Sequence, residues 1–326
     1  MKVLVTGGTG FAGGYLVNRL ISDGFEVKVI ARNPKKAEKL KDKGVEIVIG
    51  NIADKDAVKK AVKGVKKVYH LAANWRTAGV PDKVYWDVNV GGTRNLLEAS
   101  LKEGVERFVH CSTMGVHGHV DEIPANENAR YNPGDIYQIT KLEGEKLSLN
   151  FFKEKGLPVS VIRPCAIYGP GDMRLLKMFR AIARRRFVML GSGETLYHMV
   201  YVTDLAEGFR LAADKDEAIG EAFLIGGDEY KSLDNLAEMI ANEIGVSPPK
   251  IHFPVWPVEL LGTIVEKICI PLRIEPPIYK RRVLFFTKDR AFDISKAKNI
   301  LGYRPKVDLK TGIKKTVKWY KENNYL

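Results

Sequence analysis

The first half of the chain alternates short apolar runs with longer amphipathic stretches. The short runs are rich in β-branched residues and nearly continuous, which predicts strands buried on both faces of a parallel sheet. They cover Lys2–Thr6, Glu26–Ala31, Glu46–Ile49, Lys67–Leu71, Arg107–Cys111 and Val159–Arg163. Helices are predicted between and after them, over Gly13–Asp23, Pro34–Lys43, Lys55–Val62, Val90–Glu103 and Ile136–Lys155. This alternation predicts an α/β fold with a doubly wound parallel sheet of the Rossmann type.

The pattern loosens after Arg163. The segments that follow are a Pro- and Gly-rich loop, a basic helix over Leu175–Arg186, returns toward the sheet near Tyr201–Ala213 and Ala222–Ile225, a Pro-rich apolar stretch over Pro249–Phe286, and a closing helix over Leu309–Asn323. We expect a first domain over residues 1–165, with later returns near 200–226 and 288–300. Residues 166–326 would mainly form a smaller, substrate-binding lobe, because ligands of open α/β sheets bind at the carboxyl ends of the strands.

A glycine-rich loop joins the first strand to the first helix. Gly7, Gly10 and Gly13 recur every third residue, with Thr9 between the first two and Phe11 and Ala12 between the last two. Glycines in this position allow a tight turn, close approach of a pyrophosphate, and packing of helix on strand. The helix N-terminus then offers N–H donors and a positive dipole to the phosphates. The first domain is therefore predicted to bind a dinucleotide.

The end of the second strand indicates which dinucleotide is bound. NAD sites usually place a carboxylate there to hold the ribose hydroxyls. Here Arg32 stands at that position, followed by Lys35 and Lys36. A guanidinium can stack on adenine and pair with a 2′-phosphate. We predict NADP as the cofactor, with NAD as the alternative.

Candidate catalytic side chains fall on a helix and at a strand end. Tyr137 and Lys141 are four residues apart, so they share one helix face. A tyrosine has an ordinary pKa near 10, and a nearby ammonium lowers it by stabilising the phenolate. Ser112 and Thr113 follow a predicted strand, at the sheet edge where the cofactor is expected. Their hydroxyls are suited to hold a reacting carbonyl or alcohol oxygen.

These motifs together resemble the extended short-chain dehydrogenases/reductases, a group that includes sugar-nucleotide epimerases, dihydroflavonol reductases and 3β-hydroxysteroid dehydrogenases. Matching segments span nearly the whole chain. They are Thr6–Gly13, Gly50–Ile52, His70–Ala73, Asn89–Thr93, Ser112–Gly118, the pair Tyr137 and Lys141, Arg163–Pro170, Val200–Asp204 and Phe292–Ala297.

The resemblance implies a role for each matched residue. Tyr137 would be the general acid/base, Lys141 would lower its pKa and hold the nicotinamide ribose, and Thr113 would hydrogen-bond the substrate oxygen with Ser112 assisting. Cofactor contacts beyond the glycine loop, Arg32 and the Tyr-Lys pair would come from Asn51, Ile52, Leu71, Ala72, Ala73, Asn89, Cys111, Pro164, Ala166 and Ile167. Hydride would pass between nicotinamide and a substrate carbon.

Departures from the family's patterns narrow the chemistry. Dehydratases of this fold carry an acidic pair after the catalytic Thr, where this chain has Met114 and Gly115. Sugar-nucleotide epimerases usually carry a diphosphate-binding arginine where this chain has Tyr197, although Arg174, Arg180 or Arg184–Arg186 could replace it. We therefore expect an NAD(P)-dependent oxidoreductase acting on a secondary alcohol or ketone of a small, fairly apolar molecule. The alternatives are a UDP-sugar 4-epimerase with tightly held NAD, and a catalytically silent dinucleotide-binding regulatory protein.

Composition bounds the setting and the partners. The net charge is +13, and residues 250–326 hold about 17 basic and 7 acidic side chains. No motif indicates nucleic-acid binding or a metal site, and the apolar segment 253–262 could line a pocket or contact a membrane surface. Three widely spaced cysteines and an N-terminal strand without a signal peptide favour a cytoplasmic protein. The family resemblance implies a homodimer formed through the helices Val90–Glu103 and Tyr137–Lys155.

Overall fold

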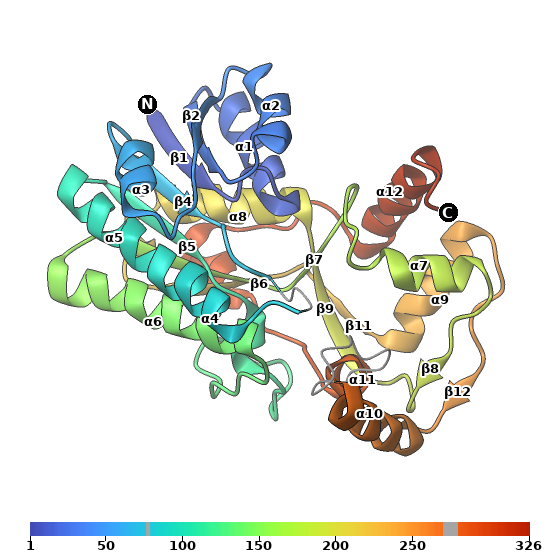
Figure 1. The fold of residues 1–326 in the computed structure, drawn as a ribbon. Coiled ribbons are helices and arrows are strands. Elements are labelled where there is room, and N and C mark those ends of the chain that lie inside the picture. The colour runs from blue at the N-terminus through green and yellow to red at the C-terminus, as the bar shows by residue number, and fades with distance from the viewer. Residues whose placement is uncertain (76–78, 270–279) are drawn as a thin grey trace.

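A computed structural model of the protein describes residues 1–75, 79–269 and 280–326. Its central sheet has seven strands in the order β10-β6-β5-β4-β1-β2-β3 (Figure 1). All neighbouring pairs in this sheet are parallel. Its strands are β1 (Lys2–Thr6), β2 (Glu26–Ala31), β3 (Glu46–Ile49), β4 (Lys67–His70), β5 (Arg107–Cys111), β6 (Val159–Pro164) and β10 (Ala222–Ile225). The predicted parallel sheet of the Rossmann type is confirmed.

Helices cover both faces of this sheet. One face carries α1 (Phe11–Ser22), α2 (Pro34–Lys41) and α8 (Val202–Asp214), whose apolar side chains share a core with Val3, Val5 and Val29. The opposite face carries α3 (Lys55–Val62), α5 (Gly92–Glu103) and α6 (Ile136–Lys155), which pack on Leu4 and Val68. Successive residues of β1 thus enter opposite cores, which is why the strand reads as a continuous apolar run.

The sequence predicted the elements of the first domain closely. Strands β1 to β6 begin and end within one residue of the expected positions. The helix expected over Val90–Glu103 begins earlier, because a π-helical turn over Trp86–Gly91 follows α4 (Asp82–Tyr85) and leads into α5. The returns to the sheet that were expected near Tyr201–Ala213 and Ala222–Ile225 form different kinds of element. Residues 202–214 return as helix α8 on the face of the sheet, and only Ala222–Ile225 adds a strand.

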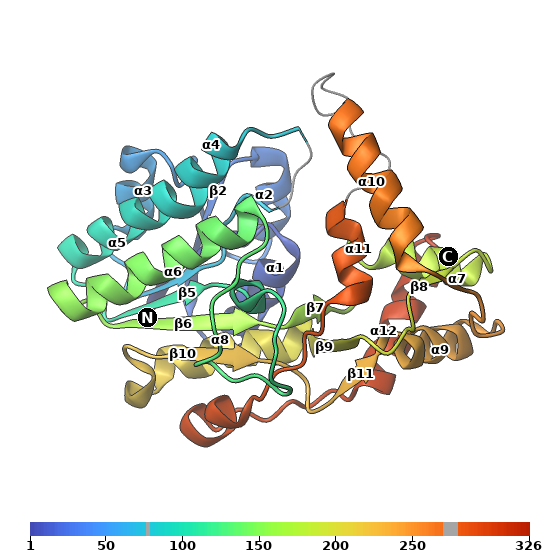
Figure 2. The ribbon, with the colours of Figure 1, turned by 90° about the horizontal axis from the view of Figure 1, so that it is seen from below.

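A second lobe lies beside the carboxyl ends of the central strands (Figure 2). Its core holds Phe179, Leu236, Ile240, Val317 and Tyr320. Its helices are α7 (Leu176–Ala183), α9 (Leu233–Ile244), α10 (Val255–Cys269), α11 (Lys280–Thr287) and α12 (Leu309–Glu322). Its strands are β7 (Ala166–Tyr168), β9 (Leu196–Tyr201) and β11 (Tyr230–Ser232) in one sheet, and β8 (Met189–Leu190) and β12 (His252–Phe253) in another.

The Pro-rich apolar stretch expected over Pro249–Phe286 becomes β12, α10 and α11, with residues 270–279 of it outside the described residues. The domain division at residue 165 stays a prediction. Among the described helices, none has both the length and the apolar character needed to cross a bilayer.

Candidate active site

One cavity of about 760 Å³ brings most of the predicted site residues together. It lies where the glycine loop, the ends of β4, β5 and β6, and the first turn of α6 meet the second lobe. The predicted residues that line it are Gly7, Gly10, Phe11, Ala12, Gly13, Leu71, Ala73, Cys111, Ser112, Thr113, Tyr137, Pro164, Ala166 and Ile167. The predicted site residues that do not line it are Thr9, Arg32, Asn51, Ile52, Ala72, Asn89 and Lys141.

The glycine loop forms a cradle that has no room for side chains. Gly7 has φ +74°, and a Cβ there would lie 2.8 Å from the backbone nitrogen of Ala72. A Cβ on Gly13 would lie 2.2 Å from the carbonyl oxygen of Gly7. Helix α1 begins at Phe11, and no side chain of the described residues caps its first turn. The uncapped N–H groups and the glycine loop therefore fit a pyrophosphate, which is the ligand that the sequence predicts.

Thr6 and His70 hold the turn after β4 against this cradle. Thr6 Oγ1 accepts a hydrogen bond from the N–H of Ala72 at 3.0 Å and lies 2.8 Å from His70 Nδ1. The other ring nitrogen of His70 lies 2.9 Å from Thr93 Oγ1. Burial lowers the pKa of His70 well below its usual value, so the ring is neutral. These buried contacts set the spacing between the loops after β1 and β4.

Asn89 acts behind the cavity wall. Its side-chain oxygen accepts from the N–H of Asn74 at 2.7 Å, and its Nδ2 donates to the carbonyl of Asn74 and to Thr140 Oγ1. The residue is only 1% exposed. It therefore ties the loop after β4 to helix α6, and its predicted contact with the cofactor stays a prediction.

The two hydroxyl side chains at the end of β5 line the cavity and differ in their hydrogen bonds. Thr113 Oγ1 accepts a hydrogen bond from the N–H of Gly115 at 3.1 Å, which leaves the hydroxyl proton available for donation. Ser112 is 2% exposed, and its Oγ has no hydrogen-bond partner among the described residues. A buried hydroxyl without a partner is costly unless a ligand supplies one. Both side chains are therefore placed to hold a substrate oxygen.

Helix α6 carries Tyr137 and Lys141. It begins at Ile136 because the Asp135 side chain accepts a hydrogen bond from the N–H of Gln138 at 2.9 Å. Tyr137 thus lies in the first turn and lines the cavity, while Lys141 lies one turn further and is 2% exposed. Burial lowers the pKa of Lys141, and the nearby Cys111 and Glu145 oppose that shift. The pair occupies the arrangement that the sequence predicted, with a buried amine behind the tyrosine.

A buried ion pair fixes α6 to β6. Arg163 donates from Nη2 to Glu145 Oε1 at 2.6 Å, with the two side chains 2% and 0% exposed. The same guanidinium donates to the Glu127 carbonyl at 2.8 Å and to Tyr131 Oη at 2.6 Å, and it lies 3.1 Å from His117 Nε2. The network therefore also anchors the loop between residues 117 and 132, whose ends contribute Gly118 and Asn132 to the cavity.

The residues predicted for the adenosine end lie apart from this cavity. Arg32 is exposed after β2, next to Asn33, whose side chain accepts from the Lys36 N–H and starts α2. Asn51 accepts from the N–H of Ala53 at 3.1 Å, and Ile52 is buried against Gly92. Their predicted contacts with adenosine stay predictions.

The second lobe closes the cavity with aromatic and basic side chains, of which Leu284, Phe285, Lys288 and Arg290 were not predicted from the sequence. Tyr197 and Phe285 line it beside Leu284, with ring centroids 5.0 Å apart and ring planes at 68° in an edge-on arrangement. Three cations also line it: Arg174, Lys288 and Arg290. Of the cations that the sequence offered in place of the diphosphate-binding arginine, Arg174 lines the cavity, and its role toward a diphosphate stays a prediction. The others are elsewhere: Arg180 donates to the Tyr325 carbonyl, and Arg184–Arg186 are exposed.

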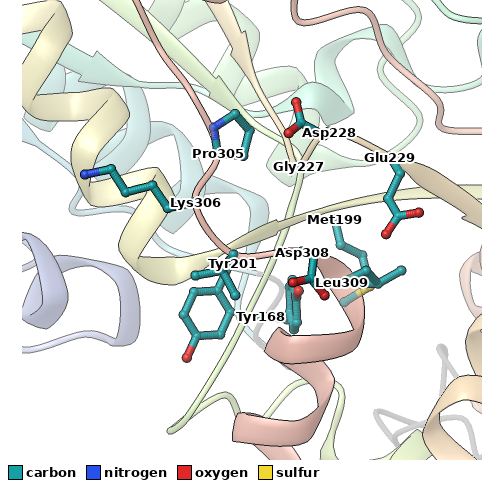
Figure 3. Close-up of a pocket in the computed structure, with 11 residues that line it drawn as sticks. Tyr168, Met199, Tyr201, Gly227, Asp228, Glu229, Pro305, Lys306, Asp308 and Leu309 are labelled. Carbon is teal, nitrogen blue, oxygen red and sulfur yellow. The ribbon is translucent and has the colours of Figure 1, made fainter.

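The described residues contain a further cavity and no metal-binding cluster. A smaller cavity of about 350 Å³ lies between β7, β9 and the start of α12, with Asp228, Glu229 and Asp308 at its rim (Figure 3). None of the predicted cofactor or catalytic residues lines it. Within the described part of the chain, no three His, Cys, Asp or Glu side chains are grouped so as to bind a metal ion.

The fold and this cavity together define a dinucleotide-binding oxidoreductase of the extended short-chain dehydrogenase/reductase class. The chain belongs to the NAD dependent epimerase/dehydratase family, whose model matches residues 3–226.

Relatives of two kinds resemble the chain over nearly its whole length. A decarboxylating sterol-4-alpha-carboxylate 3-dehydrogenase of Candida albicans is 31% identical and covers 99% of this chain and 98% of its own. A putative UDP-glucose 4-epimerase of Methanocaldococcus jannaschii is 29% identical, with 99% of both chains covered. The solved UDP-glucuronic acid 4-epimerase of Bacillus cereus in complex with NAD is 25% identical, with TM-score 0.79 and 99% of both chains covered.

Proposed function

We propose that this enzyme interconverts a secondary alcohol and a ketone of a small, fairly apolar molecule, with a preference for NADP. The observation that carries the proposal is the apolar wall of the cavity. Tyr197 stands where the family's sugar-nucleotide epimerases usually have a diphosphate-binding arginine, and it packs edge-on against Phe285. Aromatic side chains here favour an apolar ligand surface over a diphosphate. The similarity to a sterol dehydrogenase is consistent with this substrate class.

The chain's own residues would perform the proton chemistry. In the oxidative direction, Thr113 and Ser112 hold the substrate hydroxyl, and Tyr137 removes its proton as the phenolate. The buried Lys141 ammonium stabilises that phenolate electrostatically. In the reductive direction, Tyr137 returns the proton to the carbonyl oxygen. Nicotinamide, when bound beside Pro164 and Ile167, supplies or accepts the hydride.

The NADP preference rests on Arg32. Its exposed side chain follows β2, and no carboxylate occupies the position where NAD sites hold the ribose hydroxyls. A 2′-phosphate would gain charge-assisted hydrogen bonds from the guanidinium. NAD is the alternative cofactor, because the similar UDP-glucuronic acid 4-epimerase of Bacillus cereus was solved in complex with NAD.

A UDP-sugar 4-epimerase is the second candidate. The specific observation in its favour is that Arg174, Lys288 and Arg290 line the cavity and could face a diphosphate. Arg174 is partly engaged, since its Nε lies 3.0 Å from Asp172 Oδ1.

A catalytically silent dinucleotide-binding protein is the third candidate. The cavity-lining Thr113 and Tyr137 argue against it. The thiols of Cys111 and Cys165 are free, which favours a reducing compartment such as the cytoplasm.

A thermal-shift screen distinguishes these functions. The purified protein is first analysed by native mass spectrometry for a copurified dinucleotide, and then melted with NADP or NAD, alone and with UDP-glucose or apolar cyclic ketones. The proposal expects NADP to raise the unfolding midpoint and apolar ketones to raise it further. Copurified NAD with stabilisation by UDP-glucose alone would instead establish the epimerase.

A further inference from the structure

We propose that the second lobe carries a docking surface for an anionic lipid membrane, separate from the catalytic cavity. The surface, here called the apolar edge, consists of Val188, Ile251, Phe253, Trp256, Leu260 and Leu261. Trp256 is 68% exposed and Ile251 is 64% exposed. Single exposed apolar side chains are ordinary, but a group of large ones marks an interaction site.

These side chains lie in or directly beside three adjoining elements, β8, β12 and the start of α10. Strand β12 pairs with β8, with His252 opposite Met189, and the Met189 N–H donates to the Ile251 carbonyl at 3.0 Å. Val188 therefore lies beside Ile251 at the end of this strand pair. Phe253 leads directly into α10, where Trp256 and Leu260 are four residues apart and share one face. Figure 1 shows β8, β12 and α10 near one another.

Cations lie at one end of the apolar edge, because β8 and β12 are parallel and both are preceded by basic residues. Arg184, Arg185 and Arg186 are exposed at the end of α7, two residues before Val188, and Lys250 is exposed immediately before Ile251. Two acidic side chains lie near the apolar edge: Glu259 precedes Leu260 on α10, and Asp234 lies 3.4 Å from the ring of His252. An apolar strip with four cations at one end matches the interface of an anionic bilayer, where each cation adds attraction and tryptophan lies at headgroup depth.

The charge distribution disfavours a second copy of the chain as the occupant. In a twofold interface the same surface meets itself, so an interface between two copies would contain the Arg184–Arg186 cluster twice and would join two surfaces of the same charge sign. Like charges brought together in this way oppose association. An anionic lipid surface instead neutralises the arginines while it buries the apolar edge. Since no described helix crosses a bilayer, the contact would be peripheral.

Vesicle flotation tests the proposal without any turnover, so its outcome is independent of the proposed substrate. The full chain is mixed with vesicles of phosphatidylcholine alone or with phosphatidylglycerol added. The wild type is expected to float with the anionic vesicles only and to be released by high salt. Trp256→Ser with Leu260→Ser should abolish flotation, and replacing Arg184, Arg185 and Arg186 by Gln should weaken partitioning roughly a hundredfold.

Matched controls keep the test specific. Lys55, Lys59 and Lys60 are exposed on α3, at the far side of the central sheet, so their replacement by Gln removes the same charge elsewhere. Leu101→Ser removes an exposed leucine from α5. Both controls should float like the wild type, and all variants should keep its unfolding midpoint. Absence of wild-type flotation, or equal loss in the α3 control, would overturn the proposal. So would loss of self-association in the Trp256 variant without any vesicle binding.

Discussion

At the residue scale, the most restrictive feature is the lack of space around Gly13. Adding a methyl group there would bring a carbon within 2.2 Å of the Gly7 carbonyl oxygen, so the loop must shift. We expect Gly13→Ala to cost about 1–3 kcal/mol as overpacking and to weaken dinucleotide binding strongly. Gly14→Ala is the matched control, because its nearest contact would be the Gly8 carbonyl at 3.7 Å. Isothermal titration with NADP checks both, and equal affinities would contradict the cradle.

The second prediction at this scale concerns the cofactor preference that Arg32 is proposed to set. Arg32→Asp replaces the proposed partner of the 2′-phosphate with a repelling carboxylate. Because a hydrogen bond to a charged group contributes about 1.5–3 kcal/mol, NADP affinity should fall roughly tenfold to a hundredfold while NAD affinity changes little. Lys39→Asp makes the same charge change at an exposed position of α2 and should have a small effect. Equal losses for both dinucleotides in Arg32→Asp would refute the NADP assignment.

At the element scale, the buried pair Arg163 and Glu145 attaches the catalytic helix to the sheet. Glu145→Gln leaves the guanidinium buried without its counter-charge, so the free energy of unfolding should fall by about 3–5 kcal/mol. Glu143→Gln, two residues away, breaks an exposed pair with Lys146 whose side chains are 39% and 50% exposed, and should cost less than about 1 kcal/mol. Urea denaturation measures both, and similar costs would show that burial of the pair does not matter.

The sequence was sufficient for elements whose pattern is local. The strands and the start of α6 follow from apolar runs and from caps such as Asp135, which act over a few residues. The wall of the cavity was harder to predict, because Tyr197 and Phe285 are far apart in the chain and meet only through the second lobe. The partners of Arg163 were missed for the same reason, since Glu127 and Tyr131 lie in an irregular loop.

At the scale of the whole molecule, four buried histidines should make stability depend on pH. Burial lowers the pKa of His70, His110, His117 and His198 from the ordinary value of 6.5. The unfolded chain takes up protons near that value and the folded chain does not. Stability is therefore full above pH 6.5 and falls progressively as the pH drops below it.

His110 tests this dependence most cleanly, because neither ring nitrogen has a hydrogen-bond partner among the described residues. His110→Phe should make the fall in unfolding midpoint between about pH 7.5 and about pH 5.5 shallower than in the wild type. Differential scanning calorimetry across that range measures the slope. An unchanged slope would show that His110 is not a source of the acid sensitivity. The homodimer expected through α5 and α6 stays a prediction at this scale.

The central claim is that Tyr137, supported by Lys141 and Thr113, exchanges a proton with a secondary alcohol or ketone while nicotinamide exchanges hydride. The most direct measurement is the turnover number of Tyr137→Phe, with the apolar ketone or alcohol that stabilises the wild type, alongside its dissociation constant for NADP. The account predicts that kcat falls about 10²- to 10⁴-fold while cofactor affinity stays nearly intact. Retained turnover in Tyr137→Phe would contradict the proposed mechanism.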